Sequence, residues 1–170
     1  WGGSPCEAWV SENKLTEIGF FQEIPERFKN STPKSTIDRW FKNFSSPTVL
    51  FNGMIYPIIP FTIKGAIWYQ GESNVGRHDQ YIELFPGMIE DWRKRWGETF
   101  PFYFVQIAPF KYNADPKMNI SQKLRDSQRK SQKVPKTGMV VTLDIGDYTN
   151  IHPANKQEVG KRLARLALVN

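Results

Sequence analysis

Hydrophobic and polar positions along the chain predict strands that alternate with helices. Short apolar runs bounded by polar or turn-forming residues are typical of buried strands, and apolar residues spaced by three and four are typical of amphipathic helices. The predicted strands cover residues 66–69, 102–108 and 138–143, and the predicted helices cover 77–96, 120–134 and 155–168. Strands that alternate with helices favour a parallel sheet with helices on both faces.

The clearest helix is predicted over residues 77–96. Pro86 should kink it and Gly97 should end it, since proline blocks a helical hydrogen bond and glycine favours the turn after a helix. Its apolar stripe is interpreted as core and not as a cofactor site. The stripe comprises Tyr81, Leu84, Phe85, Met88, Ile89, Trp92 and Trp96.

The amino-terminal third has weaker patterns. Helical segments are predicted over residues 6–15 and 36–44. Residues 48–61 contain apolar side chains broken by two prolines, and they predict a short buried helix. The final helix, 155–168, is expected to turn Val159, Leu163, Leu166 and Ala167 inward.

The stretch 64–74, KGAIWYQGESN, is the strongest candidate for a site. The run 66–69 predicts a strand buried on both faces, and Gly71 should break it. A polar cluster, which includes Gln70 and Glu72, surrounds that break. In open α/β sheets the loops at the carboxyl ends of the strands form the ligand crevice. The alternative interpretation is a capped turn, with Ser73 and Asn74 capping the following helix.

Composition narrows the functional classes. The chain has 170 residues, 39% of them hydrophobic, and a net charge of +6. The basic residues cluster on predicted helices without interleaved exposed aromatics, so a solvated face is favoured over a nucleic-acid groove. One cysteine, Cys6, and two histidines without ligand spacing predict neither a disulfide nor a metal site. No cofactor and no membrane span are expected.

His152 is the candidate general base. It lies in the loop after the third predicted strand, and an imidazole titrates near neutral pH. The alternative is a histidine that caps the last helix. The acid that would orient it could be Glu72, Asp144 or Asp147. Position alone does not choose among these three carboxylates.

Neither candidate serine makes a convincing nucleophile. Ser73 does not fit the G-x-S-x-G elbow, because Val75 stands where glycine is needed. Ser4 follows a double glycine, but no strand precedes it in this chain. A Gly-Gly pair can present backbone N–H groups to an oxyanion, although most such pairs are only turns.

Four blocks of the sequence nevertheless resemble one family. They are WGGSPCEAW at 1–9, VLFNGMIYPIIPFTIKGAIWYQGESN at 49–74, FPFYFVQIAPF at 100–110, and TGMVVTLDIGDYTNIHPANKQEVGKRLA at 137–164. They are similar to sialate O-acetylesterases and related carbohydrate acetylesterases of the SGNH-hydrolase type. The resemblance implies a three-layer α/β/α sandwich with a parallel, flavodoxin-like sheet, and a serine esterase that acts on O-acetylated sugars, sialic acid first among them.

The resemblance also implies roles for individual residues. His152 would be the general base, Gly2 and Gly3 would supply a backbone oxyanion donor, and Gln70 a side-chain donor. The usual pattern places Asp three residues before the histidine, where this chain has Thr149. Glu72 is therefore the expected acid, with a backbone carbonyl and then Asp147 as alternatives.

The family's early GQSN-like block is absent from residues 1–170. The chain is therefore expected to be the carboxyl-terminal portion of a single SGNH-type domain that lacks the first strands. The nucleophilic serine would lie on an upstream segment or a second chain, and the sheet would have an exposed apolar edge. Family resemblance further implies secretion or periplasmic export. The alternatives are an acetyl xylan esterase and a non-catalytic carbohydrate-binding or assembly fragment.

Overall fold

The computed structural model describes residues 1–19, 44–112 and 119–169. They fall into two compact units, one formed by Trp1–Thr62 with Glu83–Glu98, and the other by Ile63–Ile82 with Thr99–Asn170. They are called the first and the second unit. The assignment of residues 1–170 to the carboxyl-terminal portion of one domain stays a prediction.

The second unit contains a parallel three-stranded sheet in the order β1-β2-β3. Its strands are β1 (Ala66–Trp68), β2 (Phe102–Val105) and β3 (Thr137–Val140). Ala66 is paired with Phe102, and Phe102 with Thr137, so all three strands begin in register. The parallel α/β arrangement expected from the pattern of strands and helices is confirmed.

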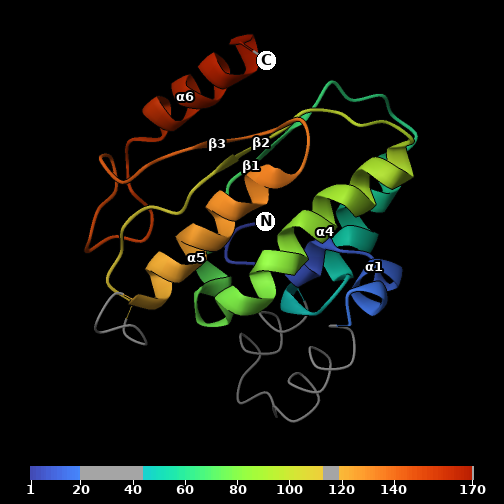
Figure 1. The fold of residues 1–170 in the computed structure, drawn as a ribbon, viewed down its shortest axis with the longest axis horizontal. Helices are drawn as coiled ribbons and strands as arrows, with labels where there is room; N and C mark the ends of the chain where they lie inside the picture. The colour runs from blue at the N-terminus through green and yellow to red at the C-terminus, as the bar shows by residue number, and fades with distance from the viewer. Residues whose placement is uncertain (20–43, 113–118, 170) are drawn as a thin grey trace. The chain divides into compact units, whose positions relative to one another are not determined.

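Two helices cover this sheet, and Figure 1 shows them on opposite sides of it. They are α5 (Asn119–Lys130) and α6 (Lys156–Val169). Helix α6 packs on one face through Val159 and Leu163, which join Tyr103, Val105 and Val140 in a buried apolar cluster. The side chains of β2 alternate between the two faces and all four are buried, as expected for a central parallel strand.

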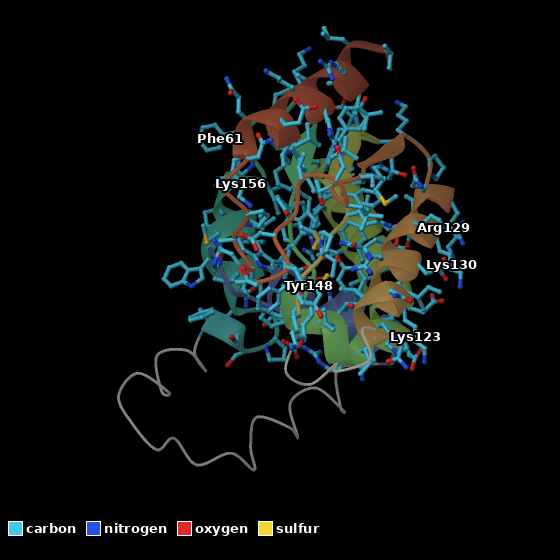
Figure 2. All side chains as sticks on the ribbon, turned by 90° about the vertical axis from the view of Figure 1, so that its left-hand side faces the viewer. Phe61, Lys123, Arg129, Lys130, Tyr148 and Lys156 are labelled. Carbon is cyan, nitrogen blue, oxygen red and sulfur yellow. The ribbon has the colours of Figure 1, made fainter. Side chains whose placement is uncertain are left out.

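Lys123, Arg129 and Lys130 of α5 form a solvated face, as the sequence predicts, whereas Arg125 is only partly exposed. In Figure 2 the side chains of Lys123, Arg129 and Lys130 extend outward from this helix. Leu124, on the opposite face, is completely buried.

Two predictions about burial in the second unit are wrong. Strand β1 is not buried on both faces, because Ile67 is 70% exposed. Among the described residues β1 pairs only with β2, so it is an edge strand. Ala167 was expected to face inward, but it is exposed near the end of α6, beyond the last buried side chain, Leu163.

The first unit is built around most of α4 (His78–Trp96), whose start belongs to the second unit. The predicted helix is confirmed, and its apolar stripe from Leu84 to Trp92 is buried. Gly97 ends it with a φ of +66°. Arg93 departs from the expected solvated face, because its side chain is buried and burial lowers its pKa.

The segment predicted as one helix over 6–15 is two short helices. A 3₁₀ turn covers Cys6–Trp9, and α1 covers Glu12–Glu17. Ser11 separates them because its hydroxyl caps α1, accepting a hydrogen bond from the Lys14 backbone at 3.3 Å. Most of the helix predicted over 36–44 lies outside the described residues.

Residues 48–61 do not form one buried helix. A π-helical turn covers Phe51–Ile55 and a 3₁₀ turn covers Tyr56–Ile58. Leu50, Phe51 and Ile55 are buried, so the prediction of burial holds for this side of the segment. The other side is exposed in the described chain, at Val49, Met54, Tyr56, Ile58 and Phe61.

Candidate active site

The loop after β1 turns sharply at Gly71. Its φ is +154°, and a Cβ at this position would lie 2.7 Å from Ile107 Cγ2 and 2.9 Å from Gln128 Nε2. A side chain here would therefore clash with the neighbouring loop and with α5. The predicted break at Gly71 is confirmed, and its physical basis is close packing as well as backbone freedom.

Gln70, just before that turn, is held in a network of buried side chains. Its Nε2 donates to Asn74 Oδ1 at 2.7 Å, and its Oε1 accepts from the Tyr81 hydroxyl at 3.2 Å. Asn74 is fully buried inside a 3₁₀ helix that covers Glu72–Arg77. The alternative in which Asn74 caps the following helix is therefore wrong. These contacts fix the orientation of the Gln70 carboxamide.

Gln128 connects the loops after β1 and β2 from its position on α5. Its Oε1 accepts from the Ile107 backbone at 2.9 Å, while its Nε2 donates to the Gln70 carbonyl at 3.1 Å and the Val105 carbonyl at 3.4 Å. The side chain is only 1% exposed. A single buried amide thus sets the spacing of two loops at the carboxyl end of the sheet.

The loop after β3 is anchored on both sides. Lys111, after β2, donates its backbone N–H to the Tyr148 carbonyl at 3.0 Å. On the other side, Arg162 of α6 clamps Asp144 through two bonds of 2.7 and 2.6 Å and donates to the Val141 carbonyl. This fork of hydrogen bonds lowers the pKa of Asp144 to about 2.

Local hydrogen bonds shape the segment that carries His152. Asp147 Oδ1 accepts from the Thr149 backbone and hydroxyl, both at 2.8 Å, and from the Asn150 backbone at 3.2 Å. The Asn150 side chain in turn accepts from the His152 backbone at 2.9 Å. His152 itself is exposed, and Pro153 behind it is buried. The backbone is thus organised while the imidazole faces solvent.

Glu72 is the carboxyl that interacts with His152. It is half-buried, and burial raises its pKa. Three kinds of contact oppose this effect: its own and Gly71's backbone N–H groups, the charge of Lys156, and the charge of His152. Within the described residues the His152 ring makes no hydrogen bond. The charge of His152 therefore acts on Glu72 without a hydrogen bond that fixes the imidazole.

The other two candidate acids are occupied elsewhere. Asp144 is paired with Arg162, and Asp147 serves as the acceptor of its own turn. Of the three candidate acids, Glu72 is therefore the one whose pKa the charge of His152 affects. The roles of these residues, and the alternative of an orienting backbone carbonyl, stay predictions.

Gly2 and Gly3 lie in the first unit, in an exposed turn in which Gly3 has a φ of +72°. Ser4 is buried beside them. Its hydroxyl donates to the Trp1 carbonyl at 3.1 Å and accepts from the Trp9 indole N–H at 2.8 Å. These contacts give Ser4 a structural role in the first unit.

The side chains and helices of the described residues also bear on metal binding and on membrane crossing. In the described part of the chain, no group of three or more His, Cys, Asp or Glu side chains is placed to hold a metal ion. Among the helices of residues 1–19, 44–112 and 119–169, none is both long and apolar enough to cross a bilayer.

Sequence reasoning missed two residues at this site. Gln128 was grouped with the solvated basic helix, and the helical spacing from Leu124, itself buried, was the available signal for its burial. Lys156 was not singled out, although it follows His152 by four residues in the IHPANK block.

Comparison with known proteins supports the resemblance seen in the motifs. A family model described as carbohydrate esterase, sialic acid-specific acetylesterase, matches residues 28–169. Sialate O-acetylesterases from Homo sapiens and Mus musculus are 36% and 34% identical over 96% of this chain. The crystal structure of a carbohydrate acetylesterase from Xanthomonas citri is similar with a TM-score of 0.78 and 40% identity, also over 96% of the chain.

These relatives are much longer. The chain spans 33% of the human protein, 36% of the mouse protein and 33% of the Xanthomonas chain.

Proposed function

The chain belongs to the carbohydrate esterase family of sialic acid-specific acetylesterases, and we propose that the protein of which it forms part removes O-acetyl groups from sugars. The names of its relatives support this activity. Because the chain spans about a third of their length, the proposal concerns the complete protein. Within it, residues 1–170 would contribute the base, its acid partner and part of the oxyanion site.

The observation that carries the proposal is the placement of Glu72 and His152 in the loops that follow two strands of one parallel sheet, β1 and β3, although they lie 80 positions apart in sequence. The charge of His152 acts on the Glu72 carboxyl, which is consistent with this placement. A carboxylate beside an exposed imidazole is the arrangement that orients a general base and stabilises it when it becomes charged.

The chemistry then proceeds in two steps. His152 accepts the proton of a serine hydroxyl as its oxygen attacks the acetyl carbonyl, and it returns that proton to the departing sugar hydroxyl. In the second step His152 takes a proton from the water that attacks the acetyl-serine, and it returns that proton to the serine oxygen as acetate leaves. Glu72 stays ionised throughout and stabilises the imidazolium.

Stabilisation of the oxyanion would come from Gly2, Gly3 and Gln70. The contacts of Gln70 with Asn74 and Tyr81 support this role, because a fixed amide needs no reorganisation during the reaction. The nucleophilic serine would be supplied by polypeptide outside residues 1–170. The greater length of the relatives supports that assignment.

The experiment is hydrolysis of a chromogenic acetyl ester by the complete protein and by two single variants. His152→Ala should lower kcat/KM by about 10²- to 10⁴-fold, and Glu72→Gln should lower it while leaving the fold intact. His78→Ala is the matched control, since His78 is the other histidine and lies at the start of α4. Equal activity of His152→Ala and His78→Ala would refute the proposal.

We propose O-acetylated sialic acid as the substrate, in preference to acetylated xylan. The family description and the net charge of +6, which attracts an anionic sugar, support this choice. Release of acetate from O-acetylated sialic acid and from acetylated xylan, compared at equal ester concentration, tests it. Secretion or periplasmic export is proposed from family membership.

A further inference from the structure

Lys156 occupies an unusual position for a cation. It is the first residue of α6, and the amino terminus of a helix carries partial positive charge that disfavours lysine. Figure 2 labels Lys156 at this helix start, together with Tyr148 in the loop that precedes it. A residue that opposes the helix dipole in this way needs a compensating interaction.

The ring of Tyr69 provides such an interaction. The Lys156 ammonium lies 4.7 Å from the centre of that ring, within the range of a cation–π contact. Tyr69 immediately follows β1 and packs against the apolar cluster shared by β2, β3 and α6. The Lys156 ammonium is therefore held against the loop that carries Glu72. Lys156 itself follows His152 by four residues in sequence.

We propose that Lys156 is a positioning residue that keeps the Glu72 carboxylate ionised beside His152, with Tyr69 as its platform. This inference rests on the proposed function, since it assigns Lys156 a part in the same base–acid pair. It does not make Lys156 a catalytic residue, because Lys156 acts through Glu72 and not on the substrate.

The charges around Glu72 support the assignment. Three titratable side chains of the second unit interact electrostatically with Glu72. Lys156 and His152 change the pKa of Glu72, and Glu72 raises the pKa of Tyr69 after the larger effect of burial. Burial is the largest effect and raises the pKa of Glu72, while Lys156 and His152 lower it. Of these two, His152 exchanges a proton in each step of the proposed reaction, whereas Lys156 takes no part in that transfer. Lys156 is thus the constant counter-charge.

The direction of the pH effect follows. Without Lys156, burial acts with less opposition, the pKa of Glu72 rises further, and the carboxyl is protonated at a higher pH. A protonated Glu72 cannot stabilise the imidazolium, so activity is lost first on the acidic side. At high pH Glu72 ionises in either case, and activity returns.

The test uses Lys156→Gln in the complete protein. We expect kcat/KM to fall by about tenfold near pH 5 and to approach the unmodified protein near pH 8.5, so that the acidic limb moves to higher pH. Lys156→Arg, which keeps the charge and the cation–π contact, should restore most of the profile. Lys161→Gln removes an exposed lysine from the same helix and serves as the control.

A second readout does not depend on activity. The ¹³C chemical shift of the Glu72 carboxyl, followed by NMR through a pH titration, reports its ionisation directly. Lys156→Gln should raise the midpoint of that titration, and Lys161→Gln should not. An unchanged midpoint, or a loss of activity equal at all pH values and not rescued by arginine, would overturn the inference.

The two readouts separate this inference from the proposed function. If the titration midpoint rises but no acetyl ester is hydrolysed by any form of the protein, the electrostatic role stands and the esterase proposal fails. If the esterase is active and depends on His152 while the midpoint and the acidic limb do not move, the esterase proposal stands and the role of Lys156 fails.

Discussion

Replacement of Gln128 by methionine should loosen the two loops that the site depends on. Methionine has a similar length and volume, so the packing of α5 is retained while both hydrogen-bonding ends of the side chain are removed. The change leaves the Ile107 N–H without the acceptor it has at 2.9 Å and removes the donor to the Gln70 carbonyl at 3.1 Å. The Gln70 carbonyl then shares the single Tyr81 hydroxyl hydrogen, at 3.4 Å, with Gln70 Oε1, at 3.2 Å.

The loss of local stability in Gln128→Met can be worked out from these contacts. An unsatisfied buried N–H costs about 1–3 kcal/mol, and the loss of a bond to a carbonyl that keeps another partner costs roughly 0.5–1.5 kcal/mol. The sum is about 1.5–4.5 kcal/mol of local stability. Since every 1.4 kcal/mol is a factor of ten, exchange of the Ile107 amide hydrogen should accelerate by about 10- to 1,500-fold.

Hydrogen exchange measured by NMR in the complete protein is the direct assay, and the urea midpoint is the second. Gln122→Met is the matched control, because Gln122 is exposed on the same helix. Gln128→Glu is informative as well. It keeps an acceptor for Ile107 but buries a carboxylate beside the Gln70 carbonyl, so its destabilisation should grow as pH rises. Exchange at Ile107 that is as slow in Gln128→Met as in Gln122→Met would contradict this prediction.

Two further predictions concern the same loops. Gly71→Ala should destabilise the protein by about 2–4 kcal/mol, because the new Cβ would lie 2.7 Å from Ile107 Cγ2 and the residue would keep a φ of +154°. Thermal unfolding tests this prediction. Gly76→Ala is the control, because a Cβ at Gly76 meets nothing within 4 Å. Arg162→Gln should return the pKa of Asp144 from about 2 towards 3.8. In the unmodified protein the Arg162–Asp144 pair is thus complete above about pH 4 and is lost as pH falls through about 2. An NMR titration of Asp144 that is unchanged in Arg162→Gln would contradict this prediction.

Much of the fold could be predicted from the sequence, because its signals are local. The apolar spacing that predicts α4 extends over about four turns, and Gly97 ends the helix because glycine adopts the positive φ that the turn needs. The parallel sheet follows from the alternation of strands and helices. Burial was less predictable: Ile67 lies in an apolar run and is exposed, because the burial of a strand residue depends on what packs over its face of the sheet.

For the candidate site, too, the sequence determines some features and the tertiary structure determines others. The residues of the QGE and IHPANK blocks and their order are a property of the sequence, and so is the family to which the chain belongs. Only the tertiary structure decided that the charge of His152 acts on Glu72 and that both aspartates are engaged elsewhere. Asp144 and Asp147 are nearer in sequence, yet one is held by Arg162 and the other by its own turn.

The positions of Lys156 over Tyr69 and of Gln128 between two loops were likewise decided by the fold. The physical reason is that such contacts join strands and helices far apart in the chain. Their distances are set by the packing of the sheet and leave no periodic trace in the sequence.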